Sequence, residues 1–507
     1  MPKDRSTTPR FQPLITASEM FPALERLCLN TKEELLMSFR IIDPMTRLRS
    51  TEAQDLGLKT WADLITHIAE RGIKVRLLIA DFDPLFTPDL HRGAWTNAQR
   101  FGHRMPKDTE ILCALHECKS APVWKRIFWP KIKNCIADLS NYAPSQLTPL
   151  QHQAMHGEVN LHPVTLHQKF AVSDGEAAII GGIDVNERRW DDEKHDRRAE
   201  ETWHDVSILI AGRVVGDLRR HFADSWERAR NSGAASFGVE VTPVSDTKPL
   251  PSKLHSASGP RLLRTISCDP ESPIRLGPRS KVTEHEEAHI AAFDSAKRLI
   301  YIETQFFRHM PLAKALARAA ERAPELQVIL VMPSEPDRLI FDGARGFDVR
   351  HAQALQLRCL RVLRRAFGDR LAILAPAQPR RAPDHTPMPL HGAGIIYLHS
   401  KVTLVDDHLG IVGSANLNGR SMRWDTEASL QFHGKRDITM IRERLMSTWL
   451  RGRKKTIDVR KASDWVRVAQ ETADLAPDAR EAYILPWPEA RNRRFARPIP
   501  ILPAEMF

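Results

Sequence analysis

Apolar and polar positions along this chain predict an alternation of strands and helices. In the first half, Leu35–Ile42 and Lys74–Ala80 are short apolar runs typical of buried strands. Between them a helix is expected from about Thr60 to Arg71, because a Thr-x-x-Asp capping pattern opens this segment and Gly72 closes it. The first half is therefore predicted to contain the order strand, helix, strand.

The second half of the chain repeats this order. A helix is expected to begin near Thr283, with Glu286 three residues on, and strands are expected over Arg298–Phe306 and Gln327–Met332, with a further helix between them. Alternating strands and helices favour a mixed sheet that helices cover on both faces. The predicted fold class is therefore α/β, with two similar lobes.

The similarity between the halves continues beyond these elements. Residues 205–212 align without a gap on residues 427–434, and each segment is followed by a helix that reaches a tryptophan. These tryptophans, Trp226 and Trp449, are expected to anchor the core because their positions match.

The repeat defines the expected domain organisation. The first lobe is predicted over residues 15–230 and the second over 261–455. Residues 231–260 are rich in Ser, Gly and Pro and are interpreted as a surface linker. Residues 456–507 are expected to form a C-terminal extension, which is Pro- and Arg-rich towards its end.

Two further segments are interpreted as loops. They are Phe82–Met105 and Pro376–Leu390, and their side chains either rim a site or belong to ordinary exposed loops. The side chains in question are Trp95, Phe101, Arg380, Arg381 and Met388.

The pattern His-x-Lys-x4-Asp occurs twice in the chain. Its residues are His167, Lys169 and Asp174 in the first copy and His399, Lys401 and Asp406 in the second. Each histidine lies two positions before its lysine in an apolar run, so the two side chains are expected on one face of a strand. Those strands are predicted over Leu166–Val172 and Ile395–Val405.

Each predicted strand is followed by a turn and a second strand of small residues. Asp174 and Asp406 fall in the turns and are interpreted as structural residues. Asn186 and Asn416 follow the second strands, where their amides can reach a ligand. Two histidines, two lysines and two amides are the groups that an enzyme acting on one phosphorus atom would need, and duplicating a half-site supplies them.

Composition adds a few limits. The chain has 507 residues and a net charge of +11, which favours an anionic partner, either a phospholipid surface or nucleic acid. Its six cysteines are scattered, so they are interpreted as thiols, and no spacing resembles a zinc site. The N-terminal residues carry no apolar signal segment, and no run approaches the ~20 apolar residues of a spanning helix. A cytoplasmic or peripheral membrane location is expected, or secretion by a route without a signal peptide.

With both copies of the motif, the chain resembles the lipid-cleaving branch of the phospholipase D superfamily. The resemblance covers roughly residues 15 to 450. It implies two lobes related by a pseudo-twofold axis, with the active site in the cleft between them. Beyond the motifs, it rests on the segments 181–186, 189–191, 203–205, 300–307 and 420–421.

The resemblance, together with the chemistry of phosphodiesters, assigns roles to the site residues. It implies that His167 is the nucleophile and that His399 is first the acid for the leaving group and then the base for water or alcohol. Lys169, Lys401, Asn186 and Asn416 would hold the phosphoryl oxygens, with no metal and no cofactor. Asp205 is assigned as the carboxylate that orients His167, and Glu427 as the carboxylate that orients His399. Gln305 and Glu303 are expected to be either head-group contacts or core hydrogen-bonding groups.

The activity that this resemblance implies is a phospholipase D. It would hydrolyse a glycerophospholipid, for example phosphatidylcholine, to phosphatidic acid and a free head group, with transfer to alcohols as a side reaction. A cardiolipin synthase-like phosphatidyl transferase is the alternative, and a nuclease is a weaker one. A monomer that acts at a phospholipid membrane surface, without nucleic acid as a partner, is expected.

Overall fold

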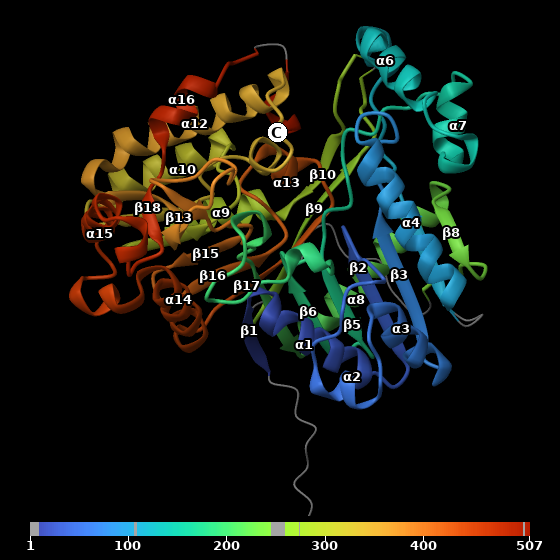
Figure 1. Cartoon of the computed structure of the whole chain (residues 1–507), viewed down its shortest axis with the longest axis horizontal. Helices are drawn as coiled ribbons and strands as arrows, with labels where there is room; N and C mark the ends of the chain where they lie inside the picture. Colours follow the sequence, from blue (N-terminus) through green and yellow to red (C-terminus); the bar gives the residue numbers. More distant parts are fainter. Residues whose placement is uncertain (1–9, 106–108, 245–258, 273, 500–501) are drawn as a thin grey trace, which may run out of the picture.

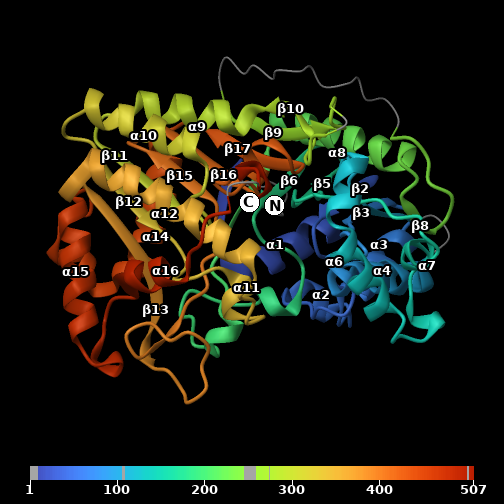
Figure 2. The same cartoon turned by 90° about the horizontal axis from the view of Figure 1, so that it is seen from above.

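The structure is a computed structural model and describes residues 10–105, 109–244, 259–272, 274–499 and 502–507. Within these ranges the strands form two mixed sheets of eight and ten strands, one from each half of the chain. The sheets lie side by side and helices flank each of them (Figure 1, Figure 2). The α/β fold class and the two similar lobes are therefore confirmed.

The first sheet has the strand order β1-β7-β6-β5-β2-β3-β4-β8. Strands β2, β3 and β4 are parallel, whereas β5, β6 and β7 are joined by antiparallel pairing. The strands are β1 (Phe11–Ile15), β2 (Glu34–Phe39), β3 (Lys74–Ala80), β4 (Glu110–Ala114), β5 (Phe170–Ser173), β6 (Ala177–Gly181), β7 (Val206–Ala211) and β8 (Ala235–Gly238).

The second sheet repeats this topology. Its order is β10-β9-β17-β16-β15-β11-β12-β13-β14, with β18 also paired to β13. The run β17-β16-β15-β11-β12-β13 matches β7-β6-β5-β2-β3-β4 strand for strand. The strands are β9 (Arg261–Cys268), β10 (Arg279–Thr283), β11 (Leu299–Glu303), β12 (Gln327–Val331), β13 (Leu371–Arg381), β14 (Ala393–Ile395), β15 (Val402–Val405), β16 (Leu409–Gly413), β17 (Glu427–Phe432) and β18 (Ile484–Pro486).

Helices cover both sheets. Those of the first lobe are α1 (Thr16–Leu29), α2 (Thr51–Asp55), α3 (Trp61–Glu70), α4 (Pro88–Arg104), α5 (Pro122–Ile127), α6 (Trp129–Leu139), α7 (Pro149–Met155) and α8 (Arg213–Asn231). Those of the second lobe are α9 (Glu284–Ser295), α10 (Met310–Arg322), α11 (Asp337–Ile340), α12 (Phe347–Phe367), α13 (Gly419–Arg423), α14 (Lys435–Leu450), α15 (Ala462–Asp474) and α16 (Glu489–Phe495). In the described residues no helix has the length and apolar composition needed to cross a bilayer.

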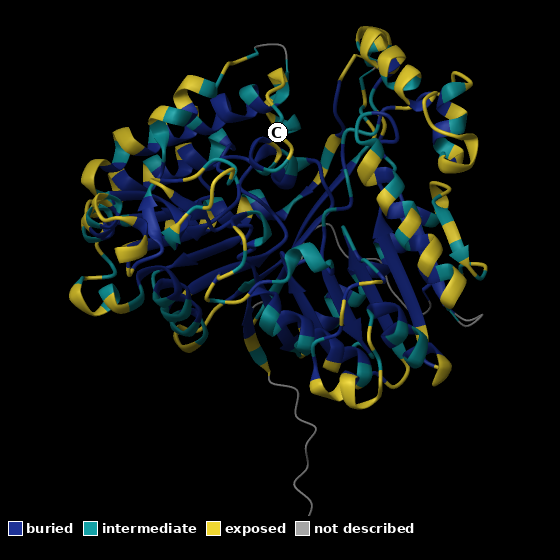
Figure 3. Ribbon diagram, in the orientation of Figure 1, coloured by how far each residue is buried: buried dark blue, intermediate teal, exposed yellow. Residues whose placement is uncertain are grey.

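One apolar core runs through both lobes. It joins side chains of β6 and β7 to side chains of β16 and β17, and it includes Trp226 of α8 and Trp449 of α14, both fully buried. The central strands are buried and the outer helix faces are exposed in both lobes (Figure 3). Since both tryptophans lie in this shared core, the prediction that they anchor it is confirmed.

The predicted elements with strong local signals are confirmed. Helix α3 begins at Trp61, and its N-cap Thr60 exchanges hydrogen bonds with Asp63 in a capping box. Strand β3 covers Lys74–Ala80 as predicted. Helix α9 and strands β11 and β12 lie within a few residues of their expected positions.

The prediction that Phe82–Met105 is a loop was wrong. Most of this segment is helix α4, in which Phe101 is buried in the core of the first lobe and Trp95 donates a hydrogen bond to Asp81 at 2.9 Å. The loop prediction for Pro376–Leu390 was partly wrong, because β13 continues to Arg381. Both segments were predicted as loops because α4 contains two glycines and the second segment contains five prolines, which are typical of loops.

The boundaries of the predicted linker and extension also change. Strand β8 lies inside the predicted linker and pairs with β4, and Thr242 accepts a hydrogen bond from buried Arg76. Residues 245–258 of the predicted linker lie outside the described residues. The C-terminal extension is built into the second lobe, because β18 pairs with β13 and the peptide nitrogen of Gly419 donates to the terminal Phe507.

Candidate active site

Both histidines of the repeated motif lie just before a strand, in segments that cross to the opposite lobe. The predicted strands start later than expected, since β5 begins at Phe170 and β15 begins at Val402. The histidines precede them because their backbones are paired with the other lobe. The peptide nitrogen of His167 donates to Thr426 at 2.8 Å, and that of His399 donates to His204 at 2.8 Å.

These contacts repeat with the symmetry of the fold. Leu166 bridges to Thr426 in parallel, and Leu398 bridges to His204 in the same way. Thr426 and His204 each directly precede an acidic residue at the head of a strand. Each lobe therefore brings its histidine next to the carboxylate of the other lobe.

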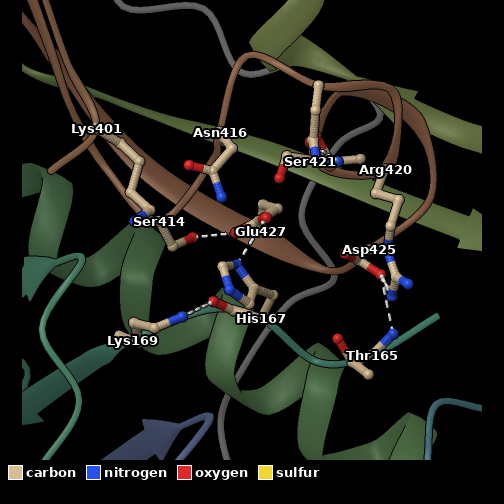
Figure 4. Close-up of polar contacts among 12 residues, drawn as sticks. Thr165, His167, Lys169, Lys401, Ser414, Asn416, Arg420, Ser421, Asp425 and Glu427 are labelled. Atoms are coloured by element: carbon tan, nitrogen blue, oxygen red, sulfur yellow. Dashed lines mark hydrogen bonds and ion pairs between the residues drawn. The ribbon is translucent and has the colours of Figure 1, made fainter. Parts of the chain in front are cut away.

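His167 is oriented by Glu427. Its Nδ1 lies 2.9 Å from Oε1 of Glu427, and the hydroxyl of Ser414 donates to the other carboxylate oxygen (Figure 4). A carboxylate on Nδ1 fixes the proton there and leaves Nε2 for chemistry. The prediction that Asp205 orients His167 was wrong.

His399 is oriented by Asp205 instead. Its Nδ1 lies 2.7 Å from Oδ2 of Asp205, both side chains being buried. The backbone of Gly182 lies close to this carboxylate, because a Cβ atom on Gly182 would stand 2.2 Å from Oδ1 of Asp205. The prediction that Glu427 orients His399 was also wrong. The two carboxylates are those that were predicted, but their partners are exchanged because the lobes exchange the segments that carry the histidines.

The two lysines lie beside their own histidines. The ammonium group of Lys169 donates to the peptide oxygen of His167 at 2.6 Å, and Lys401 makes the equivalent bond to the peptide oxygen of His399. Both lysines are almost fully buried, with 1% and 4% of their surface exposed. In Figure 4 both reach towards the space beside the His167 ring.

Burial shifts the pKa values of the histidines, carboxylates and lysines in this site. It lowers the pKa of both histidines well below the usual value, and the positive charges of the nearby lysines act in the same direction. Burial raises the pKa of Asp205 to about 7 and that of Glu427 to about 8, and it lowers the pKa of Lys401 to about 7. Because they are buried beside one another, these lysines and histidines disfavour additional positive charge.

The two asparagines stand in different surroundings. Asn416 is buried, and its Nδ2 donates to Gln305 at 3.3 Å. Gln305 in turn donates to the hydroxyl of Tyr397 at 2.8 Å. Asn186 is half-buried and caps a short helix by accepting from the peptide nitrogen of Arg188. Gln305 therefore joins Asn416 to the surroundings of His399.

Asp174 and Asp406 have matching structural contacts. Asp174 accepts from three successive peptide nitrogens at the start of β2, and Asp406 accepts from three at the start of β11. Both aspartates have a positive φ, of 53° and 49°. These bonds tie the turn after each motif strand to the neighbouring strand, which agrees with the predicted turn role.

Of the two roles predicted for Glu303, its contacts match the core hydrogen-bonding role. Its carboxylate is fully buried and accepts from the hydroxyls of Tyr301 and Ser400, at 2.6 Å each, and from Trp449 at 2.7 Å. Nε2 of His204 lies 3.4 Å from the same carboxylate.

A buried polar chain that the sequence did not reveal continues behind His399. Nδ1 of His204 lies 3.4 Å from Nε2 of His195, whose Nδ1 lies 2.7 Å from Asp191. His204 also carries the backbone contact to His399 and precedes Asp205. This series of polar contacts supports the segment that positions His399. Its two histidines, His195 and His204, are not part of the repeated motif.

A second supporting pair stands on the His167 side. Arg420 donates to Asp425 at 2.8 and 3.0 Å, and Asp425 accepts from the peptide nitrogen of Thr165 at 3.0 Å (Figure 4). This pair holds the segment that leads to His167 against the strand that carries Glu427.

Comparisons with known proteins find relatives of the phospholipase D and cardiolipin synthase type. A family model described as a cardiolipin synthase, PLD-like domain matches residues 289–449, which contain the second copy of the motif. Phospholipase D A of Dictyostelium discoideum is 25% identical over 338 residues, which cover 55% of this chain and 25% of that protein. Cardiolipin synthase A of Pseudomonas entomophila (strain L48) is 26% identical over 268 residues, 52% of this chain and 43% of that protein. The chain therefore spans less than half the length of these relatives.

A solved structure is similar along most of its length. The phosphatidylserine synthase of Haemophilus influenzae Rd KW20 is matched over 87% of this chain and 86% of that chain, with a TM-score of 0.49 and 14% sequence identity.

Proposed function

Because this chain belongs to the phospholipase D superfamily, we propose that it is a phospholipase D. In this proposal it hydrolyses a glycerophospholipid to phosphatidic acid and a free head group, and it transfers the phosphatidyl group to alcohols as a side reaction. The observation that carries the proposal is the exchanged pair of contacts, His167 with Glu427 and His399 with Asp205. One chain thereby holds two oriented histidines and two lysines in a single site.

The reaction would proceed in two displacements at phosphorus. Nε2 of His167 attacks the phosphorus atom while His399 protonates the oxygen of the leaving head group. His399 then takes a proton from water, which opens the phosphatidyl-histidine and releases phosphatidic acid. An alcohol in place of water gives a phosphatidyl alcohol by the same step.

Lys169 and Lys401 would stabilise the phosphoryl oxygens. In the structure without substrate both ammonium groups donate to peptide oxygens of their own histidines. A phosphodiester brings the negative charge that these buried cations lack, so binding would favour their protonated form. Glu427 and Asp205 hold each ring in one tautomer and stabilise it when it becomes charged.

A phosphatidyl transferase of the cardiolipin synthase type is the second candidate. It is favoured by the description of the matched family model and by the relatives named cardiolipin synthase A. Both reactions pass through the same covalent intermediate and differ in what opens it. A nuclease is a weaker candidate, since the basic net charge supports it but no relative described above is one.

The test uses mixed phospholipid vesicles with and without a primary alcohol, and the products are identified by mass. The phospholipase proposal predicts phosphatidic acid in water and a phosphatidyl alcohol in proportion to the alcohol concentration. Cardiolipin from phosphatidylglycerol, with almost no phosphatidic acid, would favour the transferase. Cleavage of nucleic acid alone would contradict both.

The proposal includes a phospholipid surface as the partner of a monomeric enzyme. The net charge of +11 would attract anionic vesicles, and added salt should weaken this attraction. Sedimentation with anionic and with neutral vesicles at low and at high salt measures this contribution.

A further inference from the structure

Three arginines near the active site each carry a buried guanidinium nitrogen, although only Arg308 is buried as a whole residue. They are Arg188, Arg189 and Arg308, and among the described residues none of them forms an ion pair. Arg308 is 7% exposed, and its Nε has no hydrogen-bond partner in the described part of the chain. Nε of Arg189 and one terminal nitrogen of Arg188 are also buried and unpartnered there.

Other buried arginines in the described residues include Arg480, which donates only to peptide oxygens, and several that are paired with carboxylates. Arg76 is 1% exposed and contacts both Glu34 and Glu110. Arg264 is 2% exposed and forms an ion pair with Glu284 at 2.7 Å. A buried cationic group without a partner is costly, so the unpartnered guanidinium nitrogens near this site indicate a position that favours an anion.

The three arginines share one set of neighbours. The guanidinium of Arg189 stacks 3.6 Å over the Trp203 ring, and that of Arg188 lies 5.1 Å over the same ring. The peptide nitrogen of Arg308 donates to Leu417, the neighbour of Asn416, at 2.8 Å, and the charges of all three arginines act on the hydroxyl of Tyr397. They therefore form one group, which we call the arginine cluster.

The arginine cluster lies on the His399 side of the site. The Trp203 ring is 4.7 Å from the His399 ring and 5.0 Å from the Tyr397 ring, between centroids. Gln305 links the Tyr397 hydroxyl to Asn416, which is assigned to the phosphoryl oxygens. A ligand group at the cluster would therefore lie next to the scissile phosphodiester, on the side of His399.

The charges of the cluster are destabilised in the absence of an anion. Burial lowers the pKa of Arg189 and of Arg308 to about 10 each, and it also lowers the pKa of Arg188. Asp184 and Asp337 act on Arg189, Asp337 acts on Arg308, and Glu201 and Asp191 act on Arg188. Among the described residues none of these carboxylates forms an ion pair with the three arginines, so their charges are offset only from outside salt-bridge distance.

We infer that Arg188, Arg189 and Arg308 bind a second anionic group, carried by the head group of the phospholipid. The inference rests on the proposed function, in which His399 protonates the head-group oxygen, because the head group then leaves on the side of His399. The preferred substrate is a phospholipid whose head group has its own phosphate or carboxylate.

The aromatic rings at this position argue against a quaternary ammonium head group. Such cations bind in cages of aromatic faces. Here the face of Trp203 is covered by Arg189, and the Phe341 ring has Arg188 at 4.7 Å. A choline group would meet guanidinium ions in place of open aromatic faces, so phosphatidylcholine would be a poor substrate.

The test compares two matched pairs of lipids in neutral detergent micelles, so that surface charge stays constant. Phosphatidylinositol 4-phosphate differs from phosphatidylinositol by one phosphate, and phosphatidylserine differs from phosphatidylethanolamine by one carboxylate. The protein is expected to prefer the charged member of at least one pair by about tenfold in kcat/KM, the scale of a charge-assisted hydrogen bond. The pair that shows the preference identifies the anion as phosphate or carboxylate.

Arg308→Gln is the main variant, because Arg308 is the most buried of the cluster. It should remove the preference while changing kcat/KM for phosphatidylinositol less than threefold. Arg361→Gln makes the same change in net charge at an exposed position of α12 and should keep the preference. Arg188→Gln serves as a second variant if Arg308→Gln does not fold. An equal loss with all four lipids would overturn the inference, since the arginine would then act on the scissile phosphodiester or on the fold.

A binding measurement separates this inference from the proposed function. Inositol 1,4-bisphosphate should bind to the wild-type protein about tenfold more tightly than inositol 1-phosphate, and Arg308→Gln should make the two affinities equal. Equal affinities in the wild-type protein would overturn the inference even if lipids are cleaved. If no lipid is cleaved but the bisphosphate is preferred, the phospholipase proposal fails and the anion subsite stands.

Discussion

Nδ1 of His167 lies 2.9 Å from Oε1 of Glu427, a residue 260 positions further along the chain. The equivalent contact in the other direction joins His399 to Asp205 at 2.7 Å. Each lobe therefore supplies the histidine that the other lobe orients. The chemical order of the two histidines can be separated by changing one carboxylate at a time.

The first prediction uses these carboxylates. Glu427→Gln should slow formation of the phosphatidyl-histidine, because it acts on the nucleophile His167. Asp205→Asn weakens His399 in both displacements, and with a substrate whose leaving group needs no acid it should slow only the breakdown. Each loss should be roughly 10^2–10^4-fold in the affected step. Rapid-quench measurement of the covalent intermediate should show it depleted in Glu427→Gln and accumulated in Asp205→Asn. The reverse result would show that the roles of the histidines are exchanged.

The second prediction concerns the histidines themselves. His167→Ala and His399→Ala should each abolish turnover, with losses above the ~10^4-fold of a single acid–base contribution, since both displacements need both rings. Peptide mapping of quenched enzyme should find the lipid adduct on His167. In His399→Ala the adduct should persist when the leaving group departs without an acid. An adduct on His399 would reverse the order and leave the reaction class unchanged.

The third prediction is a bell-shaped dependence of kcat/KM on pH. Burial raises the pKa of Asp205 to about 7 and that of Glu427 to about 8, and it lowers that of Lys401 to about 7. Activity needs both carboxylates ionised and the lysine protonated, so the rise and the fall overlap and the optimum should lie between about pH 7 and pH 8. Lys401→Arg should move the alkaline limb upward, because an arginine does not lose its proton in this range. An unchanged alkaline limb in this variant would assign the limb to another group.

The fourth prediction concerns stability. Asp406→Ala leaves three peptide nitrogens at the start of β11 without their acceptor, and Asp174→Ala does the same at β2. Each change should lower the free energy of unfolding by about 1–3 kcal/mol, measured by urea unfolding. Asparagine at either position keeps an acceptor and tolerates the positive φ, so it should cost less than half as much. Equal losses for alanine and asparagine would point to a role for the negative charge.

The fifth prediction is that excess chelator leaves the turnover rate unchanged. In the proposed mechanism Lys169 and Lys401 supply the positive charge that a cation would otherwise provide at the phosphoryl oxygens. The assay uses detergent micelles without anionic lipid, so that chelation cannot act through the surface. Activity that is lost with chelator and restored by a divalent cation would contradict the phosphohistidine scheme.

The sequence predicts most of the fold where the signals are local. Helix α3 is set by the capping box of Thr60 and Asp63 and by Gly72 after its end, so its position could be predicted to within a residue. Helix α4 could not, because Gly93 and Gly102 and its many polar residues make the segment look like a loop. Its helical state is favoured by tertiary contacts, such as the burial of Phe101, which local pattern does not contain.

The candidate site shows the same division. The spacing of His399 and Lys401 correctly indicates an extended segment, but it is identical for a strand and for a segment that pairs with the other lobe. The repeat alignment identifies Asp205 and Glu427 as equivalent residues. It cannot decide which histidine each contacts, because pairing within a lobe and pairing between lobes have the same symmetry. That choice depends on the backbone contacts at His204 and Thr426, which only the folded chain contains.

The exchange of segments between the lobes has a consequence for how this protein can vary over time. A substitution of Asp205 affects the histidine of the opposite repeat. The acidic residue of either repeat can therefore change only together with the histidine of the other repeat. The two repeats are expected to diverge more freely on their outer helices, where α4 has 17 residues and α12 has 21. At the contacts between histidine and carboxylate, the residues of the two repeats should change together.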